Sequence, residues 1–136
     1  MSADTQDSAA AIRSRFGLTP IAAFCSLASA AAFAVLPVLS IASPTFNPAH
    51  PWLFPIGAVA FASNLRRGLH PAVRAFAAVA QAFCVFELLG FSVAVSLMPW
   101  AGGWRADDWW LPATTWTLLC VCLRALFWSA RAAWPR

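Results

Sequence analysis

The chain has 136 residues, of which 61% are hydrophobic and only 10% are charged. A soluble domain carries roughly 25% charged residues, so this composition excludes a typical soluble protein and predicts an integral membrane protein of one domain. Basic residues outnumber acidic ones by nine to five. Most arginines flank apolar segments and do not form one polar face, which is typical of membrane topology and argues against nucleic-acid binding.

Residues 1–19 are polar and are predicted to form a cytoplasmic tail. Residues 20–43 form the first apolar segment and contain no charged residue. About 20 apolar residues cross a hydrocarbon core of roughly 30 Å, and the segment exceeds the 7–15 residues typical of a signal-peptide core, so we expect an uncleaved transmembrane helix. Small residues at near-helical spacing indicate either a close helix contact or simple alanine richness. These residues are Ala23, Ser26, Ala30 and Ala34.

Residues 52–67 are predicted to form a second, shorter span. Its apolar part, Trp52–Leu65, covers only about 21 Å at roughly 1.5 Å per residue, so a re-entrant hairpin is the alternative. Arginines follow this segment at once, whereas the loop before it has none, and this asymmetry favours a complete crossing. The arginines that follow are Arg66, Arg67 and Arg74.

Residues 71–98 and 109–134 are predicted to form the last two spans. Region 20–134 is therefore expected to be a single all-α domain of four transmembrane helices in an antiparallel up-down bundle. Seven arginines fall on one side of this arrangement: Arg13, Arg15, Arg66, Arg67, Arg74, Arg131 and Arg136. Only Arg105 falls on the other side, so the positive-inside rule predicts that both termini are cytoplasmic in a bacterial-type inner membrane.

Three polar residues within the apolar segments are candidate site residues: Glu87, Arg124 and Gln81. Counted from Arg74, Glu87 lies about 20 Å into the membrane, where a charged carboxylate is costly. It is expected to be either a proton or cation site or a protonated or hydrogen-bonded structural group. Arg124 lies about 10 Å deep, nearer to the depth of Gln81. It can either pair with Glu87 or extend toward the cytoplasm.

Further candidates lie at the two membrane surfaces. Outer residues that can dock a partner or border a quinone or pigment pocket are Trp104, Asp107, Asp108, Trp109, Trp110 and His50. The alternative for this outer cluster is helix capping and interfacial anchoring. Inner residues that can bind lipid headgroups are Arg66, Arg67 and Arg74, with Asn64 beside them, unless they serve only as topology signals.

The cysteines and histidines do not indicate redox chemistry. Cys120 and Cys122 fall on nearly opposite sides of a helix and lack the CxxC spacing of redox enzymes, and we interpret all four cysteines as small hydrophobic residues. His50 and His70 lie on opposite sides of the membrane and cannot together ligate a haem. We predict no metal and no cofactor of its own, while a quinone, pigment or bound lipid shared with a neighbour is compatible with the sequence.

The sequence therefore predicts an accessory or anchor subunit of a larger respiratory, photosynthetic or transport complex. No catalytic motif is present, so the role is expected to be structural and not enzymatic. Expected partners are membrane lipids and other integral membrane subunits, and not nucleic acid. The alternative is a small homo-oligomeric transporter or channel that uses Glu87 as its proton or cation site.

Overall fold

The computed structural model describes residues 20–42, 52–66, 68–97 and 109–134, with only the backbone described for 39–42. These ranges contain four helices and no strand: α2 (Pro20–Ala42), α3 (Leu53–Ser63), α4 (Pro71–Leu97) and α5 (Trp110–Ala133). The prediction of an all-helical chain is confirmed for this part. Three of the helices, α2, α4 and α5, are long and apolar enough to cross a membrane, which supports a membrane protein.

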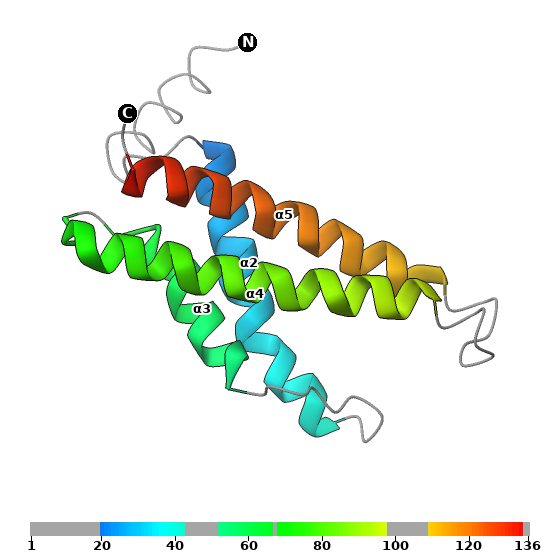
Figure 1. Ribbon diagram of the computed structural model, residues 1–136. Coiled ribbons are helices and arrows are strands. Elements are labelled where there is room, and N and C mark those ends of the chain that lie inside the picture. Colours follow the sequence, from blue (N-terminus) through cyan, green and yellow to red (C-terminus); the bar gives the residue numbers. More distant parts are fainter. Residues whose placement is uncertain (1–19, 43–51, 67, 98–108, 135–136) are drawn as a thin grey trace, which may run out of the picture.

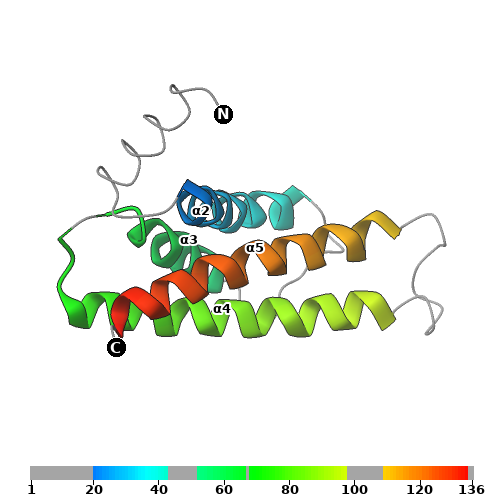
Figure 2. The same cartoon turned by 90° about the horizontal axis from the view of Figure 1, so that it is seen from above.

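The four helices form two antiparallel hairpins, α2–α3 and α4–α5, which pack on each other in two layers (Figures 1 and 2). Helix α2 contacts α3 and α5, and α4 contacts α5 and α3. Figure 1 shows that the hairpins cross obliquely. The start of α2, the end of α3, the start of α4 and the end of α5 therefore come together, whereas the opposite ends of the two hairpins diverge.

Helix α3 is shorter than the predicted segment 52–67. Its 11 residues extend about 16 Å at roughly 1.5 Å per residue, and it is not among the helices long enough to cross a membrane. Residues 64–66 leave the helix through tight turns, with backbone hydrogen bonds to carbonyls three positions earlier. A complete crossing by this segment and the re-entrant alternative both remain predictions.

Local signals set the start of α4. Gly68 has a φ of 71°, a left-handed conformation that glycine adopts without steric cost. Pro71 occupies the first turn of α4, where a backbone donor would have no partner in the helix. The backbone N–H of Ala72 donates a 3.3 Å hydrogen bond to Nδ1 of His70, which satisfies one of the free donors at this helix end.

Helices α2 and α3 pack around the ring of Phe33. Its centroid lies 5.6 Å from that of Phe61 and 6.4 Å from that of Phe54. A β-carbon on Gly57 would lie 2.6 Å from Cδ1 of Phe33, so this contact requires glycine. The buried line on α2 runs through Ala22, Cys25, Ser26, Ser29 and Phe33. Ala34, at the end of the expected small-residue stripe, is exposed instead.

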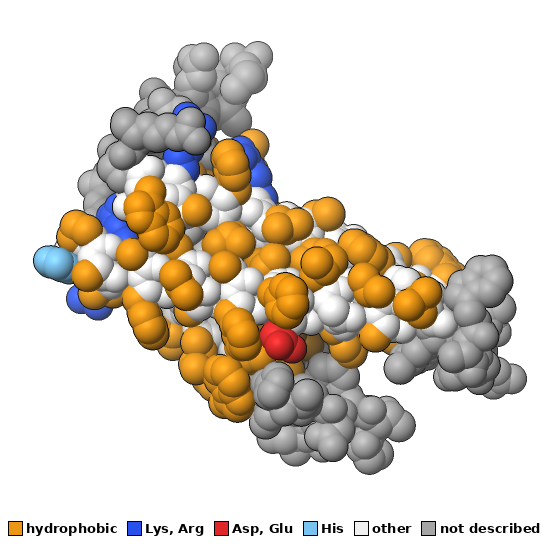
Figure 3. Space-filling view, viewed as in Figure 1, with side chains coloured by type: hydrophobic (Ala, Val, Ile, Leu, Met, Phe, Trp, Pro, Cys, Tyr) orange, Lys and Arg blue, Asp and Glu red, His pale blue; other side chains and the backbone are white. Residues whose placement is uncertain are grey.

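The interface between α4 and α5 completes the core. The buried residues that α4 and α5 contribute to the common core are Cys84, Val85, Leu88, Leu119, Cys122 and Ala125. Toward the diverging end, Nε1 of Trp116 donates a 2.9 Å hydrogen bond to Oγ of Ser96. Outside this core, large apolar side chains are exposed on all four helices, among them Phe24, Val59, Phe76 and Phe127. Figure 3 shows one such apolar face, with basic side chains gathered at its converging end.

Candidate functional site

Three buried polar side chains meet where α2, α3 and α4 converge. Nε2 of Gln81 donates to the backbone oxygen of Ala60 at 2.7 Å and to Oδ1 of Asn64 at 3.0 Å. Nδ2 of Asn64 donates to Oγ of Ser26 at 3.1 Å and, more weakly, to Oε1 of Gln81 at 3.5 Å. Both hydrogens of each amide are therefore used. We call Ser26, Asn64 and Gln81 the amide cluster.

The amide cluster is internally satisfied. Within the part of the chain that the structure describes, no buried side-chain nitrogen or oxygen lacks a hydrogen-bond partner. Gln81 is 0% exposed and Asn64 is 8% exposed, so neither amide is free to hold a substrate. An unpaired amide would cost several kcal/mol in hydrocarbon. The cluster therefore serves to join three helices at one level.

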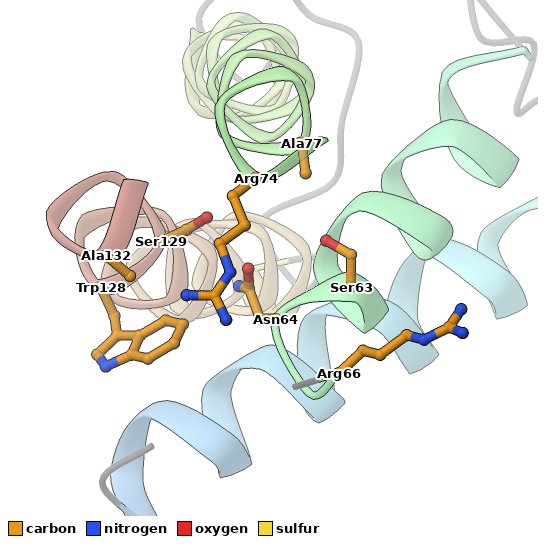
Figure 4. A pocket seen from close by; sticks show the side chains of 8 residues that line it. All are labelled: Ser63, Asn64, Arg66, Arg74, Ala77, Trp128, Ser129 and Ala132. Carbon is orange, nitrogen blue, oxygen red and sulfur yellow. The ribbon is translucent and has the colours of Figure 1, made fainter. Parts of the chain in front are cut away.

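A shallow depression, which we call the polar notch, lies beside the amide cluster between α3, α4 and α5 (Figure 4). Its lining residues are Ser63, Asn64, Arg66, Arg74, Ala77, Trp128, Ser129 and Ala132. Its enclosed volume of ≈ 10 Å³ holds about one water molecule, far below the roughly 300–1,000 Å³ of a small-molecule site. The notch therefore admits one small group of a ligand and not a whole molecule.

The polar notch is electropositive. Figure 4 shows the Arg74 side chain directed into the notch between Asn64 and Trp128, whereas the side chain of Arg66 extends away from it. Arg74 is half-buried, and the only acidic residue in the described ranges is Glu87. Glu87 lies 13 positions further along α4, or about 20 Å at roughly 1.5 Å per residue. No described carboxylate therefore neutralises Arg74.

Ser129 contributes a second unpaired polar group to the notch. The residue is 5% exposed, and its hydroxyl makes no hydrogen bond to the residues that the structure places. Its oxygen is therefore open to the notch, because no fully buried side-chain oxygen in the described ranges lacks a partner. Figure 4 shows the hydroxyl directed toward the Arg74 side of the notch. Ser129 is not among the site residues predicted from the sequence. A signal for it exists, however. Ser129 lies seven positions after Cys122 and four after Ala125, and this helical spacing puts it on the same buried face of α5.

The structure describes two of the three arginines that were predicted to bind lipid headgroups. Arg66 and Arg74 both line the polar notch, although only Arg74 is directed into it. Arg67 lies outside the described residues. Asn64, expected beside these arginines, turns its amide inward to the amide cluster. The positive charge inside the notch therefore comes mainly from the guanidinium of Arg74 and not from a row of arginines.

Glu87 and Arg124 are not joined by the structure. Glu87 is half-buried on α4 and Arg124 is exposed on α5. Within the described ranges, no ion pair connects them. On α5 the buried neighbours of Arg124 are Cys122 and Ala125, so Arg124 projects from the opposite side of the helix. Both charges consequently lie at the surface of the bundle, away from its core.

The structure describes only two of the six residues that were predicted to dock a partner or border a pocket at the outer membrane surface. Trp109 and Trp110 are exposed at the start of α5, where aromatic residues suit a membrane interface. The remaining members of that group lie outside the described residues: Trp104, Asp107, Asp108 and His50.

The four cysteines are all free, and their burial differs. Three of them, Cys25, Cys84 and Cys122, are buried, and Cys120 is exposed. The buried thiols belong to the hydrophobic core, and Sγ of Cys84 lies 3.9 Å from the backbone oxygen of Leu53.

The fold and these polar regions define the chain as a helical protein with three helices able to cross a membrane. No protein-family model matches the chain, and neither a curated protein nor a solved structure is significantly similar to it.

Proposed function

We propose that this chain is a non-catalytic accessory or anchor subunit of a larger protein complex in a bacterial-type inner membrane. The observation that carries the proposal is that Arg124 is exposed on the side of α5 that faces away from the other helices. Arg124 lies seven positions before Arg131, or about 10 Å deep at roughly 1.5 Å per residue. An arginine that faces lipid costs about 2.5–3.5 kcal/mol at the bilayer centre and less where its side chain reaches the interface. A neighbouring subunit that supplies an acidic or carbonyl partner removes this cost.

The apolar surface and the amide cluster support the same proposal. Large apolar side chains are exposed on every helix, so adjacent subunits or lipid can cover all sides of the bundle. The amide cluster uses the hydrogen-bonding groups of its two amides internally, which suits a structural part better than a transport pathway. Half-exposed Glu87 on α4 provides a second point at which a polar partner can dock.

Purification in mild detergent followed by mass spectrometry tests the proposal. We expect the tagged chain to co-purify with larger integral membrane proteins, and Arg124→Leu to release them. Arg131→Leu is the matched control, because Arg131 is also exposed on α5 but lies in its last turn. Recovery of the chain alone as a uniform oligomer would overturn the proposal. A pH-dependent ion flux that Glu87→Gln abolishes would favour a transporter.

The proposal includes four crossings with both termini in the cytoplasm. The distribution of arginines supports it, since Arg66, Arg74 and Arg131 belong to the converging helix ends. Single cysteines at Ala72 and Trp109, introduced in a cysteine-free variant, test the orientation. A membrane-impermeant thiol reagent applied to intact cells is expected to label Trp109→Cys and not Ala72→Cys. The reverse pattern would contradict the orientation.

A further inference from the structure

We propose that a phosphate group binds at the mouth of the polar notch with one oxygen inside it, held by the guanidinium of Arg74 and the hydroxyl of Ser129. This inference is independent of the accessory role, because that role rests on the exposed Arg124, whereas the notch lies at the converging helix ends and Arg124 does not line it. The ligand class is a phosphate ester or inorganic phosphate. An anionic phospholipid is the source we favour, because two of the helices that line the notch, α4 and α5, are long and apolar enough to cross a membrane.

Charge is the first argument for an anion at this site. Arg74 is half-buried and directed into the notch, and no described carboxylate lies near it. A partly desolvated guanidinium without a counter-charge is costly, whereas a bound anion offsets that cost. Arginine has a planar set of donors that matches two phosphate oxygens at once.

The hydroxyl of Ser129 is the second, independent argument. The residue is only 5% exposed, and its hydroxyl opens onto the notch without a described hydrogen-bond partner. A serine hydroxyl is a hydrogen-bond donor that an anion in the notch can use. A phosphate oxygen in the notch would accept a hydrogen bond from this hydroxyl while the other oxygens face Arg74.

The walls of the notch explain why it would hold a group of this size. Asn64 forms one wall, and the amide cluster fixes its orientation through bonds to Ser26 and Gln81. Trp128 lines the opposite part, and an indole is well suited to the boundary between headgroups and acyl chains. The enclosed volume of ≈ 10 Å³ accepts a phosphate oxygen while the rest of a headgroup stays outside.

The test uses the full chain in a maltoside detergent, which contains no phosphate. Phosphatidylglycerol is titrated in one arm and sodium phosphate in the other, with native mass spectrometry and thermal unfolding as the readouts. We expect wild type to retain one phosphatidylglycerol molecule. We expect Arg74→Gln to weaken retention about tenfold or more, and Ser129→Ala to weaken it several-fold, because hydrogen bonds to charged groups are the stronger kind.

Arg131→Gln is the matched control, since it removes an equal charge from an exposed residue in the last turn of α5 that does not line the notch. It is expected to retain the lipid. Arg74→Lys keeps the charge without the paired donors and should bind with intermediate strength, provided that its helix content matches wild type. Equal losses in Arg131→Gln and Arg74→Gln would overturn the site in favour of diffuse attraction. Absence of any bound phosphate compound in wild type would also overturn it. Stabilisation by sodium phosphate equal to that by the lipid would identify free phosphate as the source of the same ligand group.

Discussion

Gln81 on α4 and Asn64 just beyond α3 are joined by a 3.0 Å hydrogen bond from Nε2 to Oδ1, although 17 positions separate them in the chain. The other hydrogen of the Gln81 amide is donated to the backbone oxygen of Ala60 at 2.7 Å. Since lipid supplies no alternative donors or acceptors, these bonds persist only while α3 and α4 stay packed. The pair therefore fixes the end of α3 against α4.

Gln81→Leu is expected to lower the free energy of unfolding by about 1–3 kcal/mol, because Asn64 Oδ1 and the carbonyl of Ala60 lose their buried donor. Denaturant titration in detergent, followed by circular dichroism, measures the loss. The control is the double variant Asn64→Leu/Gln81→Leu. Its cost should be clearly smaller than the sum of the two single costs, because the two amides share one bond. Strictly additive costs would show that the pair does not act as a unit.

Gly57→Ala is expected to destabilise the α2–α3 hairpin by about 1–3 kcal/mol, because the added methyl group would press on the ring of Phe33. That ring cannot move freely, since it is 4% exposed and stacks on Phe61. Gly90→Ala is the control on α4, where nothing lies within 4 Å of an added β-carbon. Thermal unfolding of both variants in detergent checks this, and equal stability of the two would argue against the close contact.

Ala78→Leu is expected to disturb the packing of α4, because Ala78 is 3% exposed and leucine adds three carbon atoms at this buried position. Overpacking of this kind typically costs about 1–3 kcal/mol. Ala82→Leu adds the same atoms to an exposed position on the same helix and should leave stability nearly unchanged. The yield of monodisperse protein and its unfolding midpoint provide the measurement. A loss of yield in Ala82→Leu as large as in Ala78→Leu would contradict the prediction.

The four cysteines are expected to differ in reactivity toward a lipid-soluble maleimide. Cys120 is exposed on the surface of α5, whereas Cys25, Cys84 and Cys122 are buried. One equivalent of label should therefore be added to the native protein in membranes, and the Cys120→Ala variant should take up almost none. After unfolding in detergent, all four thiols should react. Rapid labelling of the native Cys120→Ala variant would show that the core is more open than described.

The amide cluster and the polar notch were only partly predictable from the sequence. Gln81 stands out as an amide within an apolar segment, and Arg74 as a charge beside one. Nothing local indicates that Asn64 turns inward or that Ser129 keeps an unpaired hydroxyl. Both properties depend on residues 17 to 55 positions away in the chain, from Asn64 to Gln81 and from Arg74 to Ser129, which become neighbours only when the helices pack.

The apolar segments by themselves determined that the described chain is helical and that three of its helices can cross a membrane. Length, hydropathy and the placement of Pro20, Pro71 and Gly68 act within one helix or one turn, so they can be interpreted without knowledge of the neighbours. Tertiary structure alone decided that α3 ends at Ser63, that Gly57 meets Phe33, and that the two hairpins cross obliquely. These features depend on how far each helix is rotated about its axis. That rotation is set by the fit of side chains from all four helices together.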